Sequence, residues 1–275
     1  MKRSLKAALL LSATLCSIVS CKKDKTEPAV ITPTMYIPTS DAPLAASLME
    51  VNEPTTDLGM PVPNVWGVFL SSSLECRLSD TSDNLDYHLE HWQEAFFSGP
   101  DGTGYAFPNA VSINNIAINR WDNIYYSEGV WRIDQLNHWE VTANSDVPEV
   151  SANIQGSDPF YTGTIPEQVS LSQGLNFTFD RSKVVDADSG YVLIHNQGRV
   201  ARSNTVNLRN SINATASIKP AQLSGMQNEY FSFNNKTFYG AVIEVVVVKD
   251  TIETFNDKQF VFAAQFEFAR KITFK

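Results

Sequence analysis

The sequence predicts an all-β protein behind an N-terminal leader, and three observations carry that prediction. Apolar and polar residues alternate in residues 175–180 and 259–268, which is the period of a β-strand. About seven short strand-like segments, separated by turn residues, follow one another in the last part of the chain, as in a β-sandwich. Residues 22–64 contain seven prolines, which favour extended and weakly packed chain. The expected fold is therefore a signal peptide (1–20), a disordered tether (21–64), a small β lobe (65–145) and an immunoglobulin-like β-sandwich (146–275).

The first twenty residues have the order of an export signal. Lys2, Arg3 and Lys6 precede an apolar run over residues 7–19, and the small residue Ser20 follows. A bilayer core needs about 20 apolar residues, so this run is too short to span it and is expected to be cleaved.

The four residues that end this segment, Ile18-Val19-Ser20-Cys21, resemble the bacterial lipobox. The resemblance implies that Cys21 carries palmitate-type acyl chains and that these chains bind the protein to a membrane. The charged run 22–27 (KKDKTE) is similar to that of Bacteroidota-type lipoproteins. This implies a cell-envelope protein that is anchored to the outer membrane and faces either the periplasm or the cell surface. The alternative is an ordinary secretory signal that is cut near Ser20.

The net charge bears on the class of partner, and the cysteine content bears on disulfide bonds. The formal net charge is −9, and without residues 1–20 the chain has 18 basic against 30 acidic residues. A polyphosphate backbone would be repelled, so we expect no nucleic-acid partner. Only Cys21 and Cys76 remain after cleavage, and Cys21 is the lipidation site, so we expect no disulfide within the chain.

The expected first lobe begins with a strand at residues 65–70, and a polar loop with Asp80, Asp83 and Asp86 follows. Residues 87–97 are expected to form two helical turns before the breakers at 98–104. Asn114-Asn115 separates two short apolar alternations, and because asparagine tolerates positive φ this pair predicts a hairpin turn. Strands at 122–126 and 138–141 are expected to complete the lobe, and the polar residues 143–149 to join it to the next one.

The second lobe is expected to contain strands at 175–180, 191–194, 212–218, 242–248 and 259–268. The continuous apolar run at 242–248 predicts a strand buried on both faces. Residues 110–142 and 161–179 resemble uncharacterised Bacteroidota lipoproteins, in which a small β unit precedes an Ig-like domain opened by a Gly-x-Ile-Pro segment. Here that segment is residues 163–166. The resemblance implies the fold and the location, and no activity.

The candidate sites for chemistry are weak. On a helix, His88 and His91 would share a face with Glu94, and the three could bind a metal ion. The spacing does not match the known zinc helices, so we expect surface histidines, no metal and no cofactor. Acidic loop residues such as Asp186 and Asp188 could bind calcium, but their spacing fails the EF-hand rule and turn formation is the simpler interpretation.

Two further motifs concern surface contacts. Trp121, Tyr126 and Trp131 belong to an aromatic-rich first lobe, where an exposed ring could stack on a sugar or bind a protein. Asp250-Thr251-Ile252 resembles the O-glycosylation acceptor of the same bacterial group, in which the residue at the place of Thr251 carries the glycan. It lies in what we expect to be a hairpin connection.

The sequence contains no Gly-x-Ser-x-Gly nucleophile elbow, phosphate-binding glycine loop or dinucleotide fingerprint. We therefore expect a non-enzymatic binding or scaffolding module at the outer membrane, with a glycan or a surface protein as partner. The alternatives are a glycan-active enzyme whose carboxylates the sequence does not identify, and a surface adhesin subunit that adds a strand to a neighbour's sheet.

Overall fold

The computed structural model describes most of the chain after residue 64. The expected signal peptide, Cys21 and the tether (residues 1–64) lie outside the described residues. The described ranges are 65–78, 87–98, 105–121, 124–128, 135–196, 199–209, 213–233 and 236–275.

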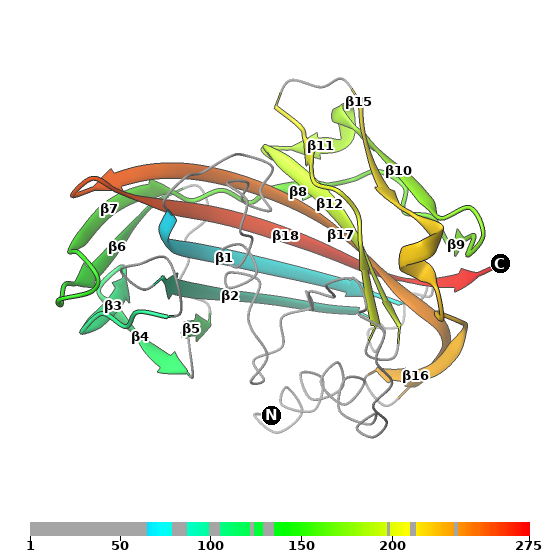
Figure 1. Ribbon diagram of the computed structural model, residues 1–275, viewed down its shortest axis with the longest axis horizontal. Helices are drawn as coiled ribbons and strands as arrows, with labels where there is room; N and C mark the ends of the chain where they lie inside the picture. The colour runs from blue at the N-terminus through cyan, green and yellow to red at the C-terminus, as the bar shows by residue number, and fades with distance from the viewer. Residues whose placement is uncertain are drawn as a thin grey trace.

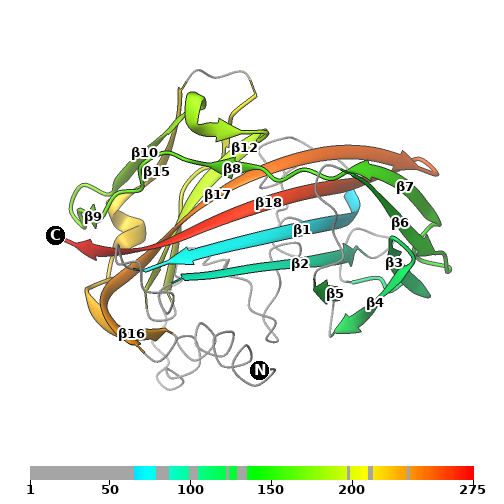
Figure 2. The ribbon, with the colours of Figure 1, turned by 180° about the vertical axis from the view of Figure 1, so that it is seen from behind.

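A long antiparallel hairpin forms the centre of the molecule. Strand β17 (Lys236–Phe255) pairs with β18 (Lys258–Phe274) along nearly its whole length. The turn between them uses Asn256 at φ 49° and Asp257 at φ 61°, a left-handed conformation that these residue types tolerate. Figures 1 and 2 show this hairpin, coloured orange to red, running across the whole molecule.

The first strands of the chain lie beside the last one. Strand β1 (Val65–Arg77) runs parallel to β18, with Val68 opposite Val261 and Arg77 opposite Arg270. Strand β2 (Tyr87–Phe97) pairs antiparallel with β1 on its other side (Figure 1). One sheet therefore continues across the boundary that we expected between residues 145 and 146, and the two expected lobes share it.

Among the described residues, this sheet has fourteen strands. Its main path is β13-β12-β17-β18-β1-β2-β5-β4-β3-β6-β7, and β14, β16 and β9 pair with β12, β17 and β18. Two smaller sheets join β10 to β15 and β11 to β8. The remaining bounds are β3 (Ala110–Ile113), β4 (Ile116–Trp121), β5 (Ile124–Glu128), β6 (Leu136–Thr142), β7 (Val150–Gln155), β8 (Phe160–Tyr161), β9 (Gln168–Val169), β10 (Leu175–Asp180), β11 (Val184–Val185), β12 (Ser189–Asn196), β13 (Arg199–Arg202), β14 (Val206–Asn207), β15 (Asn213–Ile218), β16 (Glu229–Phe233) and the 3-10 helices η2 (Arg181–Lys183) and η3 (Pro220–Leu223).

Two hydrophobic cores lie on one face of the central strands. At one end, Phe69, Phe260 and Phe262 pack with Trp139 of β6 and residues of β3 and β7. At the other end, Phe266 and Phe268 belong to a core that β10 and β15 help to build. Figure 1 shows β3 to β7 at one end of the long strands and β8, β10, β11 and β15 at the other. A separate core therefore covers the central strands at each end.

The opposite face of the same strands is also buried. Its apolar members include Val246, Val248 and Val261. Polar side chains accompany them: Glu267 and Gln265 of β18 are 2% and 3% exposed. Alternation along β18 therefore separates two buried faces of different composition.

The expected helix at residues 87–97 is wrong, because this segment is strand β2. The three- and four-residue spacing of its apolar residues also fits a strand with two buried faces, since Trp92 and Phe96 point one way and Ala95 and Phe97 the other. The segment forms a strand rather than a helix because it pairs with β1 on one side and with β5 on the other.

Two expected boundaries also need correction. The first strand does not end at residue 70 but continues through Ser71, Ser72 and Ser73 to Arg77, because it has a hydrogen-bonded neighbour on each side. Residues 143–149 connect two adjacent strands of one sheet, and the side chain of Asn144 accepts hydrogen bonds from the backbone of Asp146 and Val147.

Several predictions are confirmed. The described chain is all-β and has sandwich packing, and Asn114 and Asn115 form the β3–β4 turn at φ 54° and 62°. Val245 to Val248 are fully buried between β12 and β18. The part of the chain that the structure describes contains no helix long and apolar enough to cross a membrane.

Candidate functional site

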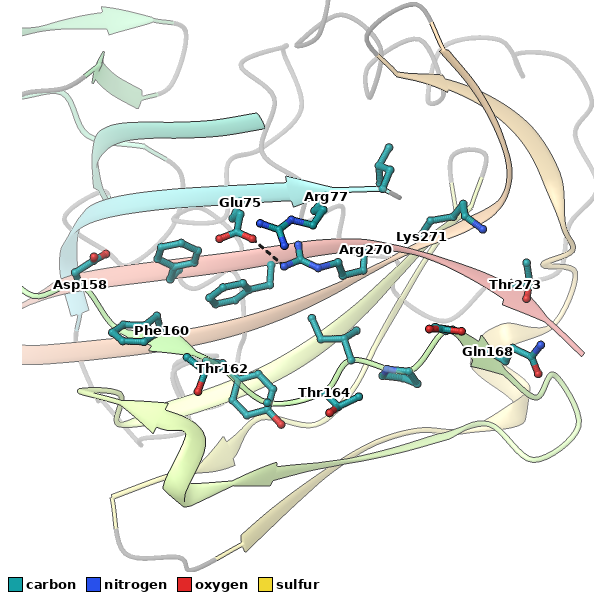
Figure 3. Close-up of a pocket in the computed structure, with 18 residues that line it drawn as sticks. Glu75, Arg77, Asp158, Phe160, Thr162, Thr164, Gln168, Arg270, Lys271 and Thr273 are labelled. Carbon is teal, nitrogen blue, oxygen red and sulfur yellow. Dashed lines mark hydrogen bonds and ion pairs between the residues drawn. The ribbon is translucent and has the colours of Figure 1, made fainter. Parts of the chain in front are cut away.

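A groove of about 840 Å³ lies between the central strands and the segment that leads into the second core. Strands β1 and β18 form its floor, and residues 158–168 form its wall (Figure 3). This volume falls within the range of about 300–1,000 Å³ that is typical of ligand sites. Its polar lining includes Glu75, Arg77, Asp158, Thr162, Thr164, Glu167, Gln168, Arg270, Lys271 and Thr273.

The apolar part of the floor is a pair of stacked rings. Phe266 and Phe268 are alternate residues of β18 and therefore share a face, and their ring centroids are 4.4 Å apart at an interplanar angle of 22°. They are 8% and 6% exposed, so most of each ring belongs to the core and a small area reaches the groove. The floor is rigid there because β17 and β1 flank β18 on both sides.

The polar part of the floor is an ion pair. Arg270 Nη2 donates to Glu75 Oε1 at 2.8 Å, and Arg270 Nη1 donates to the carbonyl oxygen of Ala269 at 2.9 Å. The two side chains are 25% and 21% exposed, so the pair can be reached from the groove. Figure 3 shows Arg77 beside them, as its position opposite Arg270 in the register requires.

The wall is fixed at both ends by backbone hydrogen bonds. Thr162 N donates to Lys183 O, and Thr273 N donates to Glu167 O, each at 2.9 Å. Between these points Gly163 lies so close to the Tyr161 ring that any β-carbon would collide with it. Tyr161 is itself held edge-on against Phe177 and Phe179. The Gly-x-Ile-Pro segment is thus the wall of the groove.

The structure separates the candidate metal ligands. On a strand, residues three apart face opposite sides, so His91 is exposed and bonds to Ser73 Oγ at 2.7 Å, while Glu94 is fully buried. The side chain of His88 lies outside the described residues. Within the described ranges, no three His, Cys, Asp or Glu side chains are grouped as metal ligands.

The acidic residues after β11 bind cations of the chain itself. Asp186 pairs with Lys249 at 3.2 Å, and Asp188 pairs with Arg209 at 2.9 Å. These contacts favour a structural role for both residues over calcium binding.

Of the three aromatic candidates, the structure describes only the side chain of Tyr126. Tyr126 is half-buried and packs against two apolar clusters. Trp131 and the side chain of Trp121 lie outside the described residues, although β4 includes the backbone of Trp121. Thr251 is exposed, but it lies within β17 and not in a hairpin connection, because the turn comes at Asn256 and Asp257.

A second set of ionisable side chains lies on the opposite face of the central strands. His195 Nε2 is 2.7 Å from Glu244 Oε2, and Trp92 Nε1 donates to Glu94 Oε1 at 3.0 Å. Burial raises the pKa of Glu94, and burial together with the neighbouring charge of Glu244 raises the pKa of Glu267.

Burial also raises the pKa of Glu244 to about 7, and it lowers the pKa of His195 to about 4. The three glutamates are at most 2% exposed, so a polymeric substrate cannot reach them. This cluster therefore belongs to the energetics of the fold, and the groove is the better candidate site.

The polar residues of the groove floor could not be recognised in the sequence because none of them forms a motif. Glu75 and Arg77 lie beyond the point where we ended the first strand, and Arg270 follows an aromatic alternation that we interpreted only as a core strand. The signal that could have led there is Gly-x-Ile-Pro at 163–166. No protein-family model matches the chain, and no curated protein matches its sequence.

Proposed function

We propose that this protein is a lipid-anchored, non-enzymatic binding module of the cell envelope, and that the groove is its ligand site. The observation that carries the proposal is the combination of a rigid aromatic floor with a half-exposed ion pair, Glu75–Arg270, in one groove. Ligand sites typically combine apolar lining with a few fixed polar groups. The N-terminal signal and Cys21 supply the anchor.

The anchor is tested by metabolic labelling in a bacterial host. Labelled palmitate is expected to enter the full chain and to be absent from Cys21→Ala. Equal labelling of both chains would contradict lipidation at this residue. Protease treatment of intact cells then distinguishes a surface location from a periplasmic one.

The groove is tested by a variant that changes its shape whatever the ligand is. Gly163→Ala places a methyl group against Tyr161 and must displace the wall or the ring. The mature chain is screened by thermal unfolding against defined oligosaccharides, peptides and fatty acids, since a bound ligand raises the unfolding temperature. Gly163→Ala should lose the shift, and Ser151→Thr, which adds a methyl group on an exposed strand residue, should keep it.

The same screen addresses the other two functions. Release of new reducing ends from a polysaccharide would replace the binding module by a glycan-active enzyme. Saturable binding of a strand-forming peptide that Gly163→Ala leaves unchanged would favour an adhesin subunit.

A further inference from the structure

We propose that the groove ligand is an uncharged oligosaccharide that lies along β18, with its hydroxyl groups bonded to the Glu75–Arg270 pair. This inference rests on the proposed function and names the chemical class of its ligand. Four properties of the groove support it: its charge balance, its donor and acceptor set, its apolar floor and the pairing of its strands.

The charges that line the groove balance. Three acidic residues (Glu75, Asp158 and Glu167) and three basic ones (Arg77, Arg270 and Lys271) line it. Arg270 Nη2 lies 2.8 Å from Glu75 Oε1, so each charge has the opposite charge beside it. A ligand carboxylate near Arg270 would be repelled by the carboxylate of Glu75, and a ligand cation near Glu75 would be repelled by the guanidinium of Arg270. A ligand without formal charge avoids both repulsions.

Hydroxyl groups match the exposed ion pair better than other uncharged groups do. A hydroxyl both donates and accepts, so one sugar hydroxyl can donate to Glu75 while its neighbour accepts from Arg270. Arg270 has five N–H groups, and its two hydrogen bonds to Glu75 and Ala269 use two of them. On the wall, the exposed hydroxyl group of Thr164 adds a donor and an acceptor, and that of Thr162 adds an acceptor, because its proton is donated to Lys183 O at 3.3 Å.

The floor suits a ring with one apolar side. Phe266 and Phe268 stack on each other and are 8% and 6% exposed, so they offer the ligand a small apolar area rather than an open ring face. The C–H side of a sugar ring can contact this area, where a charged or strongly hydrated group would lose water without compensation. The floor residues 266–273 of β18 extend over about 23 Å at roughly 3.3 Å per residue, so the groove is long enough for more than one sugar.

A peptide is the weaker occupant because the floor strands have no open edge. Peptides commonly bind a sheet by adding a strand to an unpaired edge. Over residues 266–270, β18 is paired with β17 and β1, and β1 is paired with β18 and β2 over residues 73–77. Recognition from this floor must use side chains, as sugar recognition does.

Titration calorimetry with the mature chain tests the proposal. The probes are uncharged gluco-, manno-, galacto- and xylo-hexaoses, hexagalacturonate, and a set of hexapeptides. At least one uncharged hexaose is expected to bind. Glu75→Gln should weaken that binding about tenfold or more, because a hydrogen bond to a charged group is lost. The matched control is Glu253→Gln, an exposed glutamate of β17 outside the groove lining, which should bind as the wild type does.

Thr164→Ala changes an exposed residue of the wall and leaves the floor intact, and it should weaken the same binding. It keeps the proposal testable if Glu75→Gln fails to fold. Preference for hexagalacturonate or a hexapeptide, still lost in Gly163→Ala, would overturn the sugar inference and leave the binding module standing. Uncharged hexaose binding that Glu75→Gln does not change would also overturn it. Failure of every probe to show binding sensitive to Gly163→Ala would overturn both proposals.

Discussion

The two faces of β18 are equally buried and differ in what they bury. On one face, Phe260, Phe262, Phe266 and Phe268 contribute to two aromatic cores. On the other, Gln265 and Glu267 are 3% and 2% exposed among valines of the neighbouring strands. Strict alternation usually means one buried and one solvated face. In this chain it instead separates a face held by ring contacts from a face that buries glutamates among valines, and burial raises the pKa of those glutamates.

The aromatic face is stabilised by close ring contacts, and its phenylalanine and tryptophan rings carry no charge that depends on pH. Phe69 stacks on Phe262 at 4.5 Å with a 4° interplanar angle, and it also contacts Phe97, Trp139 and Phe260. The carboxyl face carries a cost that depends on pH. Its glutamates have raised pKa values because burial disfavours their charged form, so folding requires them to hold protons near neutral pH. The two faces should therefore respond differently to mutation and to pH.

The largest expected effect is the loss of an aromatic contact centre. Phe69→Ala should reduce the free energy of unfolding by about 3–5 kcal/mol, because Phe69 is 1% exposed and four rings surround it. Urea unfolding followed by tryptophan fluorescence measures this change. Leu136→Ala is the control, since Leu136 is 61% exposed and should change the free energy by less than about 0.5 kcal/mol. Similar losses in both variants would mean that this aromatic face does not dominate stability.

The next effect concerns Asp250, a carboxyl group of the opposite face that has an arginine partner. Asp250 is 5% exposed, and Arg209 lies 3.4 Å from it and 2.9 Å from Asp188. Arg209→Met keeps an apolar stem close to that of arginine but leaves both carboxyl groups without this cation, and should cost about 2 kcal/mol because Arg209 is partly exposed. The pKa of Asp250, which burial raises to about 6, should rise further. Its titration by carbon-detected NMR measures this, and an unchanged pKa would contradict the pairing.

The pH dependence of stability tests the buried glutamates of the opposite face, Glu94, Glu244 and Glu267. Their folded pKa values lie above the ordinary value of 4.5, so their contribution is complete below about 4.5 and is lost as the pH rises, for Glu244 until about 7. His195 acts in the opposite direction between about 4 and 6.5, because its folded pKa is lowered, and it offsets one carboxyl group in that range. The free energy of unfolding should therefore be lower at pH 8 than at pH 5.

Glu267→Gln identifies the source of that change. A glutamine resembles a protonated glutamate in shape and hydrogen bonding, so the variant should match the wild type near pH 5 and exceed it at pH 8 by about 1 kcal/mol or more. Urea unfolding at both pH values measures the difference. Destabilisation of the variant at pH 8 would show that the ionised carboxylate is favourable in the folded protein.

The sequence was sufficient to predict that the chain forms strands, but not to predict which side chains surround each face of those strands. The alternation of residues 259–268 predicts β18, and Asn114-Asn115 predicts a turn, because both signals are local. The parallel pairing of β1 with β18 joins residues about 190 positions apart, and no local pattern reports it. The same pairing brings Glu75 to Arg270 and extends β1 beyond its serine run, and the longer β1 then pairs with residues 87–97 as a strand. The groove could not be predicted for that reason.

The smallest expected effect comes from a change at Thr251. This residue lies on the aromatic face of the central strands but outside both of its hydrophobic cores. It pairs with Phe262, yet its side chain is exposed while Phe262 is 2% exposed. Thr251→Ala should therefore change the free energy of unfolding by less than about 0.5 kcal/mol. Intact-mass measurement of protein purified from its native host gives a second test, because a glycan on Thr251 would add mass that the variant lacks. Equal masses, after allowance for the substitution, would show that this exposed hydroxyl is unmodified and that exposure on a strand does not suffice for glycosylation.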